Sequence, residues 1–86
     1  MALYAVSFRR SAEKDLRRLD NATQRRVLRA TSSLAREPRP AGCRKLHGSD
    51  SGFRIRVGDY RVVYTVDDEV LVIAIERVRH RREVYR

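Results

Sequence analysis

The hydrophobic periodicity of the chain changes at Phe53, and this change constrains the fold more than any other feature. Between a short first strand and Glu37, apolar residues recur at the spacing of amphipathic helices. From Phe53 onward the period is two, and runs rich in β-branched and aromatic residues follow one another with short turns between them. Strands joined by tight turns pair antiparallel, so the second half of the chain is predicted to form an antiparallel meander.

The first half predicts a short strand over residues 2–8, followed by two amphipathic helices. The first helix is expected to end at Asp20-Asn21. Asn21 and Gln24 have the spacing of a capping box, which predicts the start of the second helix. That helix is expected to continue for about four turns, at 3.6 residues per turn, until Glu37 precedes a proline.

The second half predicts strands over residues 53–57, 60–66 and 70–78, with turns at 58–59 and 67–69. Helices that lead and strands that follow indicate an α+β fold. We therefore expect an N-terminal strand, a two-helix hairpin and then an antiparallel three-stranded meander packed on the helices. A chain of 86 residues has room for one domain, residues 1–86.

The charge of the chain narrows the choice of partners. The net charge is +9 at pH 7, and Lys14 and Lys45 are the only lysines, so the excess is almost all arginine. Arginine offers a planar fork of donors that suits phosphates and stacks on bases. A nucleic acid, an acidic protein, or both in turn are the expected partners. The alternative is an arginine-rich genome that places arginine on every exposed surface.

Several kinds of site are not expected. Cys43 is the single cysteine, which excludes a disulfide within the chain and a cysteine-based metal site. The sequence has no Walker loop, GxGxxG turn or nucleophile elbow, and the acidic residues at 67–69 fit a turn better than a metal site. No cofactor and no metal are therefore expected. Without a signal peptide or an apolar run long enough for a membrane span, the expected location is the cytoplasm.

Arginines on predicted strands are the strongest candidates for a functional site. Strand alternation places Arg54 and Arg56 on one face, about 7 Å apart at a rise near 3.3 Å per residue. Arg61 follows a short turn and is expected to lie across from this pair. Like charges on neighbouring strands repel each other, so the arrangement favours an anionic ligand. The alternative is a merely solvated outer face.

The C-terminal segment mixes cations with a histidine and an aromatic ring, a pattern typical of single-stranded RNA binding. His80 is a candidate proton carrier because histidine titrates near neutral pH, although a lone histidine in a basic tail is more often passive. Tyr85 has two interpretations, since its ring could either cap the core or stack on a base.

Four segments together resemble the RelE/ParE toxin superfamily. They are Asp15-Leu16-Arg17-Arg18-Leu19, Arg44-Lys45-Leu46-His47-Gly48, Gly58-Asp59-Tyr60-Arg61-Val62-Val63-Tyr64 and His80-Arg81-Arg82-Glu83-Val84-Tyr85. The likeness covers essentially the whole chain and is closest to the RelE branch. It implies a toxin of a type II toxin-antitoxin pair that enters the ribosomal A site and cuts mRNA without metal. It also implies an acidic RelB-like antitoxin that binds the toxin and holds it silent.

The resemblance also implies a set of site residues. The catalytic positions are Arg54, Arg56, Arg61, Arg81 and Tyr85; the alignment leaves Arg79 as an alternative late arginine, with His80 as a possible addition; and Arg44, Lys45, Arg77 and Arg82 are RNA-binding candidates. Arginine stands at two positions where RelE has lysine, and arginine keeps its proton at neutral pH, so electrostatic stabilisation is expected rather than general-base catalysis.

Two other functions stay open at the level of sequence. A ParE-like inhibitor of DNA gyrase has the same fold and no nuclease activity. An inactive homologue that only binds RNA is the other alternative. For the RelE-like function, the expected partners are the antitoxin in a hetero-oligomer, the ribosome and mRNA, with no membrane.

Overall fold

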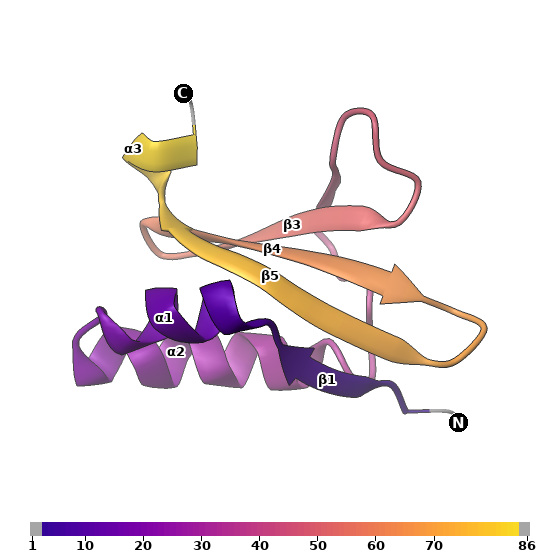
Figure 1. The fold of residues 1–86 in the computed structure, drawn as a ribbon, viewed down its shortest axis with the longest axis horizontal. Helices are drawn as coiled ribbons and strands as arrows, with labels where there is room; N and C mark the ends of the chain where they lie inside the picture. Colours follow the sequence, from indigo (N-terminus) through magenta and orange to yellow (C-terminus); the bar gives the residue numbers. More distant parts are fainter. Residues whose placement is uncertain (1–2, 85–86) are drawn as a thin grey trace.

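The computed structural model describes residues 3–84 as a five-stranded sheet with two helices against one face (Figure 1). The elements, in chain order, are β1 (Ala5–Phe8), α1 (Arg10–Arg17), α2 (Asn21–Ser33), β2 (Arg44–Lys45), β3 (Gly52–Val57), β4 (Tyr60–Asp67), β5 (Val72–His80) and α3 (Arg81–Val84). Within this part of the chain, no helix is long and apolar enough to cross a membrane.

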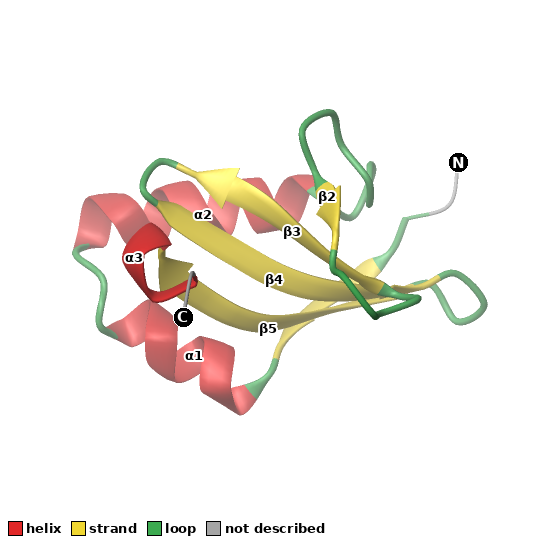
Figure 2. Ribbon diagram, turned by 90° about the horizontal axis from the view of Figure 1, so that it is seen from above, coloured by secondary structure: helices red, strands yellow, loops and turns green. Residues whose placement is uncertain are grey.

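The sheet has the order β1-β5-β4-β3-β2. Strands β3, β4 and β5 form the expected antiparallel meander, which confirms the α+β prediction. Strand β1 extends it by pairing parallel to β5, from Ala5 opposite Val72 to Phe8 opposite Ile75. At the other edge β2 adds a short antiparallel pair with β3. Figure 2 looks down on the sheet, with α1 and α2 behind it.

The core lies between the helices and the facing side of the sheet. Val62, Tyr64 and Val66 alternate along β4 with less buried residues, and all three belong to this core together with Val27 and Leu34 around α2. This period of two is the pattern on which the strand predictions rest. The opposite face of the sheet is therefore available to polar side chains.

A bulge in β5 interrupts the alternation. Val63 pairs with Arg77 but Tyr64 pairs with Ile75, so Glu76 has no partner in β4. A β-bulge of this kind shifts the side chains that follow it by one position. The residues at the start of α1 hold the bulge, because Ser11 Oγ donates to the carbonyl of Glu76 and Arg9 Nε lies 3.3 Å from Oε2 of Glu76.

Several predicted boundaries are wrong. Helix α1 ends at Arg17, before the expected Asp20-Asn21, and strand β5 continues to His80, beyond the expected residue 78. Asp20, not Asn21, is the N-cap of α2, and the Gln24 side chain donates to the carbonyl of Leu19 instead of closing a capping box. Helix α2 ends at Ser33, four residues before Glu37. Strand β5 begins after Val70, which is 65% exposed in the preceding turn.

Candidate nucleic-acid interface

The outer face of the sheet carries two rows of arginines. Residues paired directly across antiparallel strands share a face. Arg56 of β3 pairs with Arg61 of β4, and Arg61 pairs with Arg79 of β5. Arg44 of β2 pairs with Arg54, which lies two residues from Arg56 on the same face. The structure thus brings residues from four strands to one end of one face.

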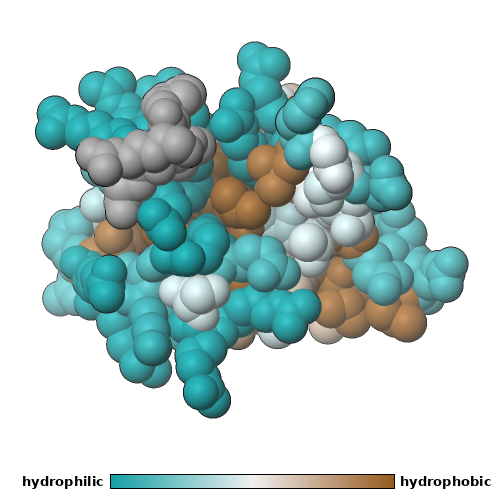
Figure 3. All heavy atoms as spheres, turned by 45° about the horizontal axis from the view of Figure 1, so that its top comes forward, coloured by the Kyte–Doolittle hydropathy of each residue, from teal (hydrophilic) through white to brown (hydrophobic). Residues whose placement is uncertain are grey.

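A hollow of about 260 Å³ lies among these side chains. Its lining residues are Gly42, Arg44, Arg54, Ile55, Arg56 and Arg61. None of them is acidic, so the hollow is strongly cationic. Figure 3 shows this side of the molecule, where hydrophilic residues cover most of the surface and hydrophobic residues show near the middle and at the lower right edge. A site of this composition can accept a phosphate, or several adjacent phosphates, from an anionic chain.

The turn between β3 and β4 orients one of the arginines. Arg56 Nε donates to the carbonyl of Gly58 at 3.0 Å. Gly58 has a φ of 60°, a conformation that glycine adopts without a steric penalty. A Cβ at this position would also lie 3.1 Å from the Arg26 guanidinium of α2. The tight turn therefore depends on glycine. Because Arg56 bonds to the carbonyl of Gly58, the direction of the Arg56 side chain depends on this turn as well.

The other end of the sheet has the opposite character. A second hollow is lined by Asp67, Asp68, Glu69 and Glu76, together with Arg9, Ser51, Thr65 and Val66. The cationic hollow therefore has a defined extent and is not part of a uniformly basic surface. In the described part of the chain no group of three or more His, Cys, Asp or Glu side chains is arranged to hold a metal ion.

Arg77 has a structural contact that the sequence did not reveal. Its Nε and Nη2 lie 2.9 and 3.2 Å from the carboxylate of Asp15 in α1. The Oδ2 atom of Asp15 also accepts the backbone N–H of Val78 at 2.9 Å. Strand β1 stops at Phe8, so in this stretch the carboxylate takes the place of a neighbouring strand at the edge of β5. Arg77 thus joins the sheet to the helix layer.

Asp15 is the residue that sequence reasoning missed. Burial acts to raise the pKa of Asp15, but hydrogen bonds from Arg77 and from Val78 N–H, together with the charges of Arg77 and Arg79, outweigh it and hold that pKa below its usual value. A signal for this role existed, because Asp15 lies three residues after Ala12 on the core-facing side of a helix whose other charged residues are exposed.

The remaining predicted site residues are divided between the two faces. His80 pairs with Tyr60, its ring makes an edge contact with the Tyr60 ring at 5.2 Å, and its Nδ1 accepts the backbone N–H of Arg82. Alternation therefore assigns His80 to the face opposite Arg61 and Arg79. Arg81 opens α3, and its N–H donates to the carbonyl of Asp59.

Lys45 lies outside the arginine cluster. Lys45 pairs with Phe53, a core residue, so it belongs to the opposite face from Arg44. It lines a separate hollow in the loop over residues 45–50. Tyr85 lies outside the described residues, and Arg82 is exposed on α3.

Comparison with known proteins agrees with this architecture. A model of the ParE toxin of the parDE type II toxin-antitoxin system matches residues 6–85. Toxin RelG of Mycobacterium tuberculosis is 38% identical over 87 residues, covering 96% of this chain and 97% of that protein. A RelE-like toxin protein of Escherichia coli is 35% identical over 86 residues, covering 95% of this chain and 90% of its own length.

Solved structures give the same result. A chain of the RelE-RelB complex from Pyrococcus horikoshii superposes with a TM-score of 0.82 at 34% identity, covering 92% of this chain and 96% of that one. The RelBE2 toxin-antitoxin complex of Mycobacterium tuberculosis gives a TM-score of 0.79 at 32% identity, covering 91% and 98%. The family model and these relatives span nearly the whole sequence, and the chain therefore belongs to the RelE/ParE superfamily of type II toxin-antitoxin toxins.

Proposed function

We propose that this toxin is a ribosome-dependent endoribonuclease that cuts mRNA and so inhibits translation. The observation that carries the proposal is the convergence of Arg44, Arg54, Arg56 and Arg61 on one hollow of the outer sheet face. Each side chain keeps its charge at neutral pH and can donate several hydrogen bonds to phosphoryl oxygens. Four such groups side by side repel one another, and an RNA backbone relieves that repulsion.

The proposed reaction is attack by an RNA 2′-oxygen on its own neighbouring phosphorus. The bond from phosphorus to the 5′-oxygen breaks, leaving a cyclic phosphate and a free 5′-hydroxyl. The 2′-hydroxyl loses a proton and the departing oxygen gains one, so no water is consumed. Arg56 and Arg61 neutralise the charge that grows on the phosphoryl oxygens, and Arg54 orients the attacking ribose. Each arginine aimed at the transition state contributes on the order of 3 kcal/mol, by analogy with oxyanion donors.

An arginine from the C-terminal part of the chain completes the proposed site beside the departing oxygen. We call it the late arginine. Arg79 is favoured over Arg81 because it pairs with Arg61 on the arginine face. His80, from the other face, is the less suitable proton donor. Tyr85 is proposed to stack on a base, and Arg82 on α3 to contact the RNA backbone.

The ribosome is proposed to supply the substrate geometry. A domain of 86 residues is too small to build both a deep RNA cleft and a complete set of acid and base catalysts. Most of its candidate acids and bases are arginines. The A site would present mRNA in a fixed conformation to the exposed sheet. Purified toxin is therefore expected to cut ribosome-bound mRNA much faster than naked mRNA, and equal rates would contradict this part of the proposal.

An acidic RelB-like antitoxin is the proposed protein partner, in a hetero-oligomer that silences the toxin. The charge of +9 supports this pairing, as do two structural neighbours that were solved as toxin-antitoxin complexes. Expression without the antitoxin is expected to stop growth, and co-expression to restore it. High yields of active protein from cells without any antitoxin would argue strongly against this partner.

The test of the activity is brief induction followed by mapping of mRNA 5′ ends across the transcriptome. The wild-type toxin should create new 5′-hydroxyl ends within translated regions. Arg61→Ala should abolish these ends and toxicity, with a melting temperature close to that of the wild type. Arg25→Ala, which removes an exposed arginine from α2, is the matched control and should stay toxic. A toxic Arg61→Ala variant would remove this residue from the site.

The same experiment separates the second candidate function. The family model that matches residues 6–85 is described as the ParE toxin, which favours inhibition of DNA gyrase as the alternative. A gyrase inhibitor would trigger the DNA-damage response without new mRNA ends. Harmless expression would instead indicate an inactive homologue that binds RNA.

A further inference from the structure

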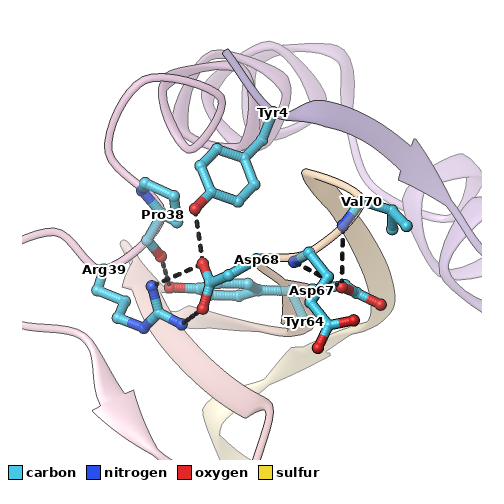
Figure 4. Close-up of polar contacts among 8 residues, drawn as sticks. Tyr4, Pro38, Arg39, Tyr64, Asp67, Asp68 and Val70 are labelled. Atoms are coloured by element: carbon cyan, nitrogen blue, oxygen red, sulfur yellow. Dashed lines mark hydrogen bonds and ion pairs between the residues drawn. The ribbon is translucent and has the colours of Figure 1, made fainter. Parts of the chain in front are cut away.

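Arg39 and Asp68 together join three segments that are far apart in the sequence (Figure 4). The Nη2 atom of Arg39 lies 2.8 Å from Oδ2 of Asp68, and its Nη1 lies 3.3 Å from Oδ1. The Tyr4 hydroxyl donates to the same Oδ1 at 2.6 Å. The carboxylate of the β4–β5 turn therefore binds both the chain before β1 and the connection that follows α2.

Aromatic side chains of the sheet fix the same connection. The guanidinium of Arg39 lies 5.1 Å from the centre of the Phe53 ring, within the range of a cation–π contact. The neighbouring Tyr64 hydroxyl donates to the carbonyl of Pro38 at 2.7 Å. The two rings stack on each other at 6.0 Å. Residues 38 and 39 are therefore held to both β3 and β4.

The contacts of Pro38 and Arg39 form an anchor for this connection. In the sequence, the anchor comes just before two residues that line the cationic hollow. Gly42 and Arg44 line the hollow, and Arg44 pairs with Arg54 in the short strand β2. Between the anchor and β2, one backbone hydrogen bond links Cys43 N–H to the carbonyl of Pro40. Gly42 has a φ of 90°, and because it has no Cβ it could adopt many other conformations if the anchor were lost.

From this geometry we infer that Arg39 is a positioning residue, which holds the connection so that Arg44 reaches the RNA beside Arg54. The inference rests on the proposed function only in taking RNA as the ligand. Arg39 is not among the residues that line the hollow. The ion pair is exposed, with 43% of the Arg39 side chain and 54% of the Asp68 side chain accessible. Exposed pairs contribute little to folding stability, so the contact acts mainly on the local path of the chain.

Asp68→Asn provides the sharpest test, because the two effects of this substitution oppose each other. Removing a carboxylate makes the protein more positive, and simple electrostatics then predicts tighter RNA binding. Loss of the anchor predicts weaker binding instead. Affinity for a single-stranded RNA with 2′-O-methyl groups, which cannot be cleaved, is measured by fluorescence anisotropy. We expect Asp68→Asn and Arg39→Ala to weaken binding several-fold, and unchanged or tighter binding by Asp68→Asn would overturn the inference.

A double-mutant cycle tests whether Arg39 acts through Arg44. Arg39→Ala and Arg44→Ala should each reduce the salt dependence of log Kd by the same amount, about 0.7 for one lost phosphate contact. The double variant should lose no more than Arg44→Ala alone. If the losses were additive, so that the salt dependence of log Kd in the double variant fell by the sum of the two single changes, Arg39 would bind RNA itself. Arg36→Ala removes an exposed arginine three residues earlier and is the control for charge alone.

Amide hydrogen exchange separates this inference from the proposed function. Arg39→Ala and Asp68→Asn should speed exchange at residues 43–45 without changing the melting temperature of the domain, whether or not RNA binds. If the wild-type protein did not bind RNA, the proposed function would fail while the exchange data still tested the anchor. Unchanged exchange at residues 43–45 would overturn the positioning role.

Discussion

Replacing Asp15 with alanine is expected to destabilise the domain more than the loss of any exposed charge. The side chain of Asp15 is 8% accessible and accepts hydrogen bonds from Arg77 and from the backbone N–H of Val78. Removing it leaves the Val78 N–H without its partner at the edge of β5. An unsatisfied buried donor costs about 1–3 kcal/mol.

The lost ion pair adds less to the destabilisation than the loss of a fully buried pair would. The Arg77 side chain is 40% accessible, so water can solvate its charge after the substitution. Together the two losses amount to about 3 kcal/mol. Domains of this size shift by about 4–8 °C per kcal/mol, so the melting temperature should fall by about 12–24 °C. Small domains have a stability of only about 5 kcal/mol, so the variant should be marginally folded.

The assay is thermal unfolding of toxin that has been separated from its antitoxin and refolded. Glu13→Gln, an exposed carboxylate on the same helix, is the control and should melt within a few degrees of the wild type. Asp15→Asn retains an acceptor for the Val78 N–H and should fall between the control and Asp15→Ala. If Asp15→Ala melted like the control, this carboxylate would not be what holds the edge of β5.

The pH dependence follows from the lowered pKa of Asp15. A carboxyl whose pKa is lower in the folded state adds stability that is fully present above its unfolded value, near 3.9, and is lost as the pH falls through the folded value. The difference in stability between the wild type and Asp15→Asn should therefore be largest at neutral pH and shrink below about pH 4. A difference that stayed constant down to pH 2 would show that the charge of Asp15 contributes nothing.

Three other substitutions test further parts of the structure. Gly58→Ala should lower stability by about 1–2 kcal/mol in a melt, because its φ is positive and a Cβ would crowd Arg26. Tyr64→Phe removes the hydrogen bond to the Pro38 carbonyl and should cost about 1 kcal/mol by the same measurement. In a growth assay, Arg79→Ala should reduce toxicity more than Arg81→Ala, and the reverse ranking would make Arg81 the late arginine of the site.

The sequence predicts the meander well because one face of it is buried. Val62, Tyr64 and Val66 face the core, so a slip of one residue would expose all three. The same alternation predicts that Arg54 and Arg56 share the outer face, and the short turn predicts Arg61 beside them. These predictions depend on residues that are close in sequence. Here the alternation along each strand and the pairing across a short turn give the same arrangement.

Other features depend on contacts between distant residues, which a local pattern cannot reveal. The parallel pairing of β1 with β5 joins residues more than 60 positions apart, and the apolar residues of β1 predict burial without naming a partner strand. Strand β2 consists of two exposed basic residues and has no apolar pattern at all; its conformation follows from pairing with β3. The ion pair between Asp15 and Arg77 likewise joins residues 62 positions apart.

The bulge at Glu76 links these long-range contacts to the candidate site. Ile73 and Ile75 face the core, and strict alternation would continue that face through Arg77 and Arg79. Because Glu76 has no partner in β4, Val78 is buried instead, and alternation then assigns Arg79 to the same face as Arg61. The contacts of Arg9 and Ser11 with Glu76, and the hydrogen bond from the backbone N–H of Val78 to Asp15, hold this shift in place. The helix layer thereby determines which basic side chains of β5 reach the outer face, although it lies on the other side of the sheet.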